Sequence, residues 1–223
     1  MPDVPSRDGR FSGGSAAWGD AAVVIPWTMY LSYGDTRVLE NQYASMKAWV
    51  DYMRRHAGED SLWNTGHHYG DWLAFASTAS DYPGATTGKD LIATAFFAHS
   101  TDLLRRTAEV LGRTEDAAEY GALLPRIKAA FQKEFVTATG RVGENTQTAY
   151  VLALQFDLLP EELRLQAARR LAAEVRTRGH RAHRPNWVRT QLSRLGSHPV
   201  RRPVAARPRT WRFSWRRRPG GQA

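Results

Sequence analysis

The stretch "AAVVIPWTMYLSYGDTRVLENQYASMKAWVDYMRRH", residues 21–56, decides the fold class. From Asp35 onward its apolar side chains recur three and four residues apart, which predicts an amphipathic helix; they are Val38, Leu39, Tyr43, Met46, Trp49, Val50 and Met53. Residues 21–33 are apolar nearly all round, as is typical of an inner, buried helix. Gly34 can end that helix and Asp35 can cap the next, so the two helices form a hairpin.

The same pattern recurs twice along the chain. We expect helices over residues 89–111 and 115–135, and again over residues 146–156 and 160–176. The link within each pair is short, whereas the links between pairs are long and carry polar and aromatic residues. Such a period favours a toroid of inner helices covered by outer ones, with the long loops at one end. The sequence therefore predicts an all-α fold with about three helical hairpins of an incomplete ring.

Charge divides the chain into two parts. The formal net charge is +9, yet residues 181–223 hold twelve arginines and no Asp, Glu or Lys, which leaves residues 1–180 at about −3. We therefore expect a folded body, residues 1–180, and a disordered tail, residues 181–223. Our preferred interpretation of the tail is an out-of-frame extension, because the acidic residues and the apolar periodicity of the body both stop abruptly where the tail begins. A nucleic-acid-binding arm and a membrane-surface segment are the alternatives, although Pro199, Pro203, Pro208 and Pro219 would break a helix there.

Composition excludes several kinds of site. The chain has no cysteine, so it can form neither a disulfide nor a thiolate metal site. The N-terminal residues are polar, with no signal-peptide core, and no apolar run approaches the ~20 residues of a membrane-spanning helix. We expect no cofactor, no metal and no membrane partner, and a cytoplasmic location by default.

Two loop segments could carry chemistry. "AAWGDAAV", residues 16–23, holds Trp18 and Asp20, and "LWNTGHHYGDWLAF", residues 62–75, holds Asp71 and Trp72. Each sets an acid beside a tryptophan and a glycine, and indole rings with carboxylates are typical of carbohydrate sites. Simpler interpretations stay open, because Asp20 can cap a helix, Asp71 can follow a turn, and either tryptophan can pack under a loop.

The remaining polar candidates are weaker. His67 and His68 are adjacent, so in an extended chain their side chains point to opposite faces, which argues against a shared metal. His99 lies in an apolar helix and is expected to be a core histidine. Glu144 precedes the third inner helix, where either a functional role or a capping role would explain it.

Three segments carry a family resemblance. "AAWGDAAVVIPWTMYLSYGDTRVLENQYASMKAWVDYM", "NTGHHYGDWLAF" and "GENTQTAYVLALQFDLLPEE" occur in this order with helices between them. Together they closely resemble the six-hairpin catalytic domain of bacterial α-L-rhamnosidases, over about residues 2–179. The resemblance implies an (α/α)6 toroid, of which this chain holds part, and a glycoside hydrolase that releases terminal α-L-rhamnose with inversion.

The resemblance also implies where the catalytic groups lie. In this family the general acid is a Glu in a loop ending in Trp-Thr-Gly-Asp, and the general base is a Glu after Trp in a later loop. Neither motif occurs in this sequence, so the resemblance implies a fragment without its acid and base, inactive alone. It leaves Trp18 and Trp72, with Asp71 and Asp20 as polar neighbours, as substrate-binding residues for a rhamnose-containing glycoside.

Other functions stay in competition with this one. Another six-hairpin glycosidase and a non-catalytic carbohydrate-binding remnant are the alternatives. The resemblance argues against a nucleic-acid partner, since the basic tail begins where the family pattern stops. The sequence does not decide the oligomeric state, the rhamnoside linkage or the location of the parent enzyme.

Overall fold

The fold is helical, as the periodicity predicts. The computed structural model describes residues 13–71 and 86–178. Trp72 and the predicted tail, residues 181–223, lie outside the described residues. Six helices follow one another: α1 (Ala21–Tyr33), α2 (Arg37–Ala57), α3 (Lys89–Val110), α4 (Thr114–Phe135), α5 (Gln147–Gln155) and α6 (Glu161–Arg178). In the described part of the chain, the only β pairing is an isolated bridge between Val136 and Val142.

Short turns join the helices into three hairpins. Gly34 and Gly112 both have a φ of 69°, the left-handed conformation that glycine adopts without steric cost, at the turns after α1 and α3. Gly34 donates its backbone N–H to the carbonyl of Tyr30 and so closes α1. Asp35 does not occupy the cap position of α2, which belongs to Thr36, but its carboxylate accepts the backbone N–H of Arg37.

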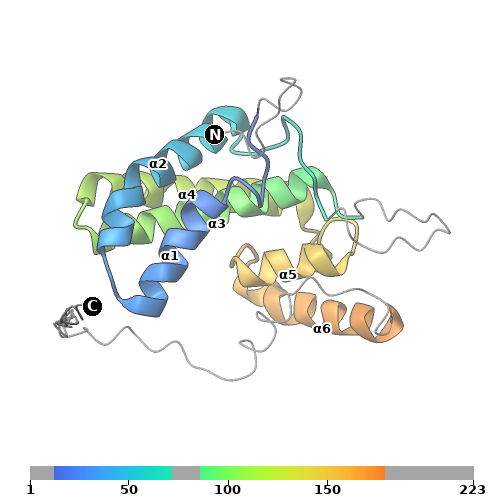
Figure 1. The fold of residues 1–223 in the computed structure, drawn as a ribbon. Coiled ribbons are helices and arrows are strands. Elements are labelled where there is room, and N and C mark those ends of the chain that lie inside the picture. The colour runs from blue at the N-terminus through green and yellow to red at the C-terminus, as the bar shows by residue number, and fades with distance from the viewer. Residues whose placement is uncertain (1–12, 72–85, 179–223) are drawn as a thin grey trace, which may run out of the picture.

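The hairpins pack in the predicted order. α3 contacts both α1 and α5, so the three inner helices lie in sequence with α3 in the middle. α2 packs on α1 and α3, α4 packs along α3, and α6 packs on α5 (Figure 1). This arrangement confirms a partial ring of inner helices with outer ones against them.

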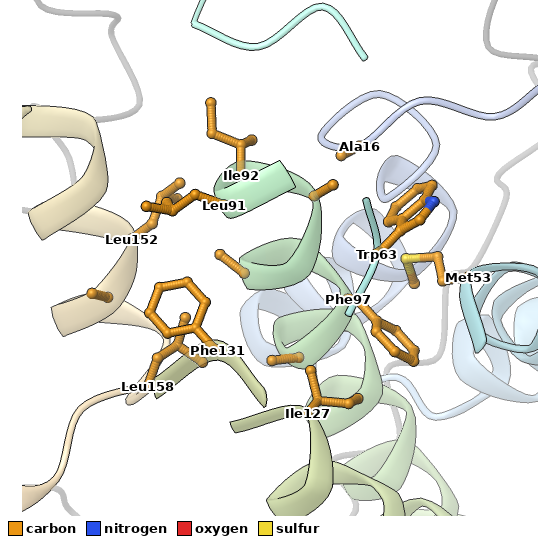
Figure 2. Packing of buried hydrophobic residues seen from close by; sticks show 14 of the residues in the cluster. Ala16, Met53, Trp63, Leu91, Ile92, Phe97, Ile127, Phe131, Leu152 and Leu158 are labelled. Atoms are coloured by element: carbon orange, nitrogen blue, oxygen red, sulfur yellow. The ribbon is translucent and has the colours of Figure 1, made fainter. Parts of the chain in front are cut away.

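One continuous apolar core runs across α3. Figure 2 shows Phe97 beside Met53 and Trp63, while Phe131 lies on the other side of α3, near Leu158. All five side chains are almost entirely buried. The core therefore links α2 and the 58–71 loop to α4 and the segment after α5.

The expectation that α1 is buried is wrong. Only Val23 and Pro26 of its thirteen residues are buried, whereas Ile25 is 56% exposed and Leu31 is 64% exposed. α1 lies at one end of the series of inner helices, and none of the described elements covers its outer face. An apolar composition identified an inner helix correctly, but burial also requires a neighbour.

No helix among the described residues combines the length and the apolar character that a membrane crossing needs.

Candidate functional site

The long loops meet at the end of the molecule where the inner helices begin. The backbone N–H of Ala16, before α1, donates to Nδ1 of His68 at 3.2 Å. The hydroxyl oxygens of Thr87, before α3, and Thr146, the N-cap of α5, lie 2.6 Å apart. The starts of all three inner helices are thus tied to one loop cluster, as the hairpin period predicts.

The Trp-Gly-Asp segment before α1 is built around Trp49 of α2. A Cβ atom on Gly19 would lie 2.2 Å from the indole of Trp49, so no side chain fits at this position. The same indole donates its Nε1–H to Oδ1 of Asp20 at 2.9 Å. Gly19 and Asp20 therefore serve one purpose, which is to seat the loop on the Trp49 ring.

Asp20 is turned into the protein. Its exposed fraction is 0%, and its carboxylate accepts hydrogen bonds from the Ala17 backbone N–H (2.8 Å), from Trp49 and from the Ser100 hydroxyl of α3. Burial raises the pKa of this carboxyl, against the opposite effect of these three donors, because a low dielectric disfavours the charged form. Asp20 occupies the N-cap position of α1, as the capping interpretation predicts, but no hydrogen bond joins its side chain to the first turn of that helix.

Trp18 is the exposed member of the same segment. Its side chain is 49% exposed, and its ring centroid lies 5.6 Å from that of Tyr69, with the ring planes at 52°. The residue before it, Ala17, has a φ of 71°, which is an unfavourable backbone conformation for any residue other than glycine. The hydrogen bond from Ala17 to Asp20 holds the backbone in this conformation.

The two adjacent histidines separate as expected. His68 is buried edge-to-face against Trp63, whereas His67 is exposed and lies edge-on to Tyr69. Since Nδ1 of His68 accepts from Ala16, the ring proton is on Nε2, which donates to the carbonyl of Thr65 at 3.1 Å. Burial lowers the pKa of His68 to about 4, so the ring is neutral near pH 7. In residues 13–71 and 86–178, no group of three His, Asp or Glu side chains is arranged to hold a metal ion.

Asp71 joins the loop after α2 to the residues that precede α3. Its carboxylate accepts the backbone N–H groups of Thr86 (2.8 Å) and Thr87 (3.1 Å), and also both of their hydroxyl groups. These four donors occupy the acceptor capacity that a carboxylate offers. Gly70, with a φ of 70°, makes the turn that aims Asp71 at them. Trp72, the next residue, lies outside the described residues, so its predicted sugar contact stays a prediction.

Glu144 and His99 have structural partners. Glu144 accepts the backbone N–H of Gly88, the N-cap of α3, at 3.2 Å, and so caps a helix from another hairpin. The pKa of Asp90, in the first turn of α3, is raised mainly by burial. The negative charges of Glu134 and Glu144 add to this effect. His99 stacks on Phe156 at 4.0 Å, and burial lowers its pKa to about 4. The residue is half-buried at the edge of the core, and so only partly fits the prediction of a core histidine.

Sequence reasoning missed the groups that hold the candidate residues. Trp49 and Ser100 fit the apolar faces of their helices, and Thr86, Thr87 and Thr146 look like ordinary loop and capping residues. The single available signal was that both acids sit beside glycines, which often permit a close approach of another group.

Comparison with known proteins identifies the family. The sequence model of the bacterial alpha-L-rhamnosidase 6 hairpin glycosidase domain matches residues 1–184. The chain belongs to this family. It is thus a member of a glycoside hydrolase family, and its three hairpins are part of an (α/α)6 six-hairpin domain.

Curated relatives of this chain are named alpha-L-rhamnosidases. An alpha-L-rhamnosidase of Streptomyces avermitilis is 45% identical over 173 residues, which are 78% of this chain and 16% of the relative. One from Alteromonas sp. is 43% identical over 152 residues, 66% of this chain and 16% of the relative. The chain therefore spans about a sixth of the length of these relatives.

Solved structures of the family share its fold. The crystal structure of the Streptomyces avermitilis alpha-L-rhamnosidase complexed with L-rhamnose has a TM-score of 0.66 at 42% identity and covers 78% of this chain and 16% of that one. The native enzyme from Aspergillus terreus has a TM-score of 0.68 at 36% identity, covering 74% of this chain and 19% of that one.

Proposed function

We propose that this chain is part of an inverting α-L-rhamnosidase and contributes three of the six hairpins, together with loops that contact a terminal α-L-rhamnose. The observation that carries the proposal is the family match over residues 1–184, in which the exposed Trp18 stands at the loop end of the inner helices. An exposed indole offers a flat apolar surface to one face of a sugar ring.

We further propose that the general acid and the general base come from residues that this sequence does not contain. Inversion requires two carboxyl groups about 6.5–9.5 Å apart, with room for a water molecule between one of them and the sugar. The two candidate acids do not suit this task. Asp20 has no exposed surface, and the four donors from Thr86 and Thr87 occupy Asp71. Both acids are suited to holding loops, and the chain alone should not hydrolyse rhamnosides.

A chimera tests the substrate class, because it supplies the missing groups. The aligned 173-residue segment of the Streptomyces avermitilis relative is replaced by the matching residues of this chain. We expect this chimera to hydrolyse 4-nitrophenyl α-L-rhamnoside. The change Trp18→Ala should lower its kcat/KM at least about tenfold, because a stacking contact to the sugar is lost.

The control is Gln42→Ala on the exposed face of α2, which should leave kcat/KM unchanged. A chimera that folds, as judged by circular dichroism and a cooperative melt, but cleaves no α-L-rhamnoside would contradict the proposal. A folded chimera that cleaves a different glycoside in preference would favour the alternative six-hairpin glycosidase.

A further inference from the structure

Two aromatic rings from different loops lie together at the candidate site. Trp18 precedes α1, and Tyr69 belongs to the loop that follows α2. Their centroids are 5.6 Å apart. Trp18 is about half exposed, Tyr69 is partly exposed, and the exposed His67 lies edge-on to the other side of the Tyr69 ring. Tyr69 is not among the residues that the sequence predicts to bind the substrate.

Both rings stand on anchored backbone. On the Trp18 side, the buried Asp20 binds α2 through Trp49 and α3 through Ser100. On the Tyr69 side, His68 binds the Ala16 backbone, and Asp71 binds Thr86 and Thr87. Polar groups next to each ring in sequence therefore point inward and hold the loop, while the rings remain at the surface. Such preorganisation lowers the entropic cost of binding a ligand.

The angle between the rings restricts what they can bind. Because their planes meet at 52°, one flat face of a sugar can stack on one ring but not on both. The second ring then contacts an edge of the same sugar. An aromatic ring makes a favourable contact with an apolar group and offers poor compensation to a hydroxyl that loses its water.

We propose that Trp18 and Tyr69 form one contact surface for a 6-deoxyhexose, with the Trp18 ring against the apolar face of the sugar and Tyr69 against the methyl group at C5. This inference rests on the proposed function, because L-rhamnose is L-mannose without its C6 hydroxyl. Tyr69 would then be a specificity-determining residue, which distinguishes the methyl group from a hydroxymethyl group. Asp20 and Asp71 would be positioning residues that hold the two loops.

The test compares two ligands that differ at C6 alone. The 223-residue chain is titrated with methyl α-L-rhamnoside and with methyl α-L-mannoside, up to tens of millimolar, and binding is followed by two-dimensional ¹H–¹⁵N NMR. Burying one methyl group favours the rhamnoside by about fourfold in affinity. We expect Tyr69→Ala to remove this preference and Tyr69→Phe to retain it, because the ring and not the hydroxyl makes the contact.

Tyr33→Ala is the matched control, since this tyrosine on α1 is 80% exposed and lies outside the two loops; it should leave both affinities unchanged. Each variant is accepted only if its amide spectrum outside the 58–71 loop overlays that of the parent chain. Tyr69→Gln, which keeps a long side chain but places a polar amide group beside C6 of the sugar, replaces Tyr69→Ala if the latter does not fold.

Three results would overturn the inference: a preference that survives in a folded Tyr69→Ala or Tyr69→Gln variant, equal affinity of the parent chain for both sugars, or no binding of either. None of these three binding results contradicts the proposed function, which is tested by the turnover of the chimera. A chimera that is inactive while the chain discriminates between the two sugars would overturn the proposed function and leave the contact surface standing.

Discussion

The Trp-Gly-Asp segment shows what a single residue can contribute at this site. The two residues that follow Trp18 both contact Trp49, whereas Trp18 itself remains exposed. Gly19 packs against the Trp49 indole, and Asp20 accepts a hydrogen bond from the Nε1–H of the same indole. The sequence indicated that these residue types suit a sugar site. It could not indicate that Asp20 faces inward, since its partners Trp49 and Ser100 come from two other helices and their identity depends on tertiary packing.

Gly19→Ala should destabilise the fold. The added Cβ would meet a buried, rigid indole that cannot move aside without losing its hydrogen bond to Asp20. We expect a loss of about 1–3 kcal/mol in the free energy of unfolding, typical of overpacking, measured by urea denaturation. Gly121→Ala is the control, because a Cβ there meets only ordinary van der Waals contact with Arg105. An unchanged stability for Gly19→Ala would contradict the described packing of Trp49.

His68 should make stability depend on pH. Burial lowers the pKa of the folded-state ring to about 4, from an ordinary 6.5. Between these pH values the unfolded chain binds a proton that the folded chain does not, so this contribution to stability is complete above pH 6.5 and is lost as the pH falls toward 4. The slope due to His68 is at most about 1.4 kcal/mol per pH unit.

The measurement is urea unfolding at several pH values between about 4.5 and 7. This range covers most of the interval between the folded-state and unfolded-state pKa values of His68. His68→Asn, whose side-chain oxygen can still accept the Ala16 N–H, should flatten the curve, while His99 continues to contribute a slope of its own. The same change at the exposed His56 is the control. If the curves of His68→Asn and the parent chain are parallel, the ring is not buried in its neutral form.

At the scale of elements, periodicity predicted each helix and most boundaries to within a few residues, because spacing and turn glycines act locally. Burial of α1 could not be predicted in the same way. Its composition indicates an inner helix, yet Ile25, Met29 and Leu31 are exposed in the chain as it stands. An exposed apolar helix face of this kind promotes association. We expect poor solubility from it.

Replacing two of these side chains tests the exposure of α1. The double variant Ile25→Gln/Leu31→Gln should keep its free energy of unfolding within about 0.5–1 kcal/mol of the parent chain, because neither residue has a buried contact to lose. Its solubility should rise and its binding of an apolar dye should fall. By contrast, Leu39→Ala in the core should cost about 2–5 kcal/mol. A large destabilisation by the double variant would mean that this face is covered in solution.

At the scale of the whole molecule, the described residues form three hairpins of a six-hairpin domain, and their loops meet at one end. The gathering of the loops was predictable, since alternating short and long links place the long ones together. The network that joins them was not, because Asp71 finds its donors fifteen and sixteen residues further along the chain. At this scale we propose that the chain carries sugar-contacting loops without the two carboxyl groups that inversion needs.

The most direct measurement of that claim is a ¹H NMR time course of 4-nitrophenyl α-L-rhamnoside incubated with the purified 223-residue chain. The account predicts that free L-rhamnose appears no faster than in buffer, and that Trp18→Ala changes nothing. Release of L-rhamnose above that background, lowered by Trp18→Ala, would show that the chain holds its own acid and base and would contradict the account.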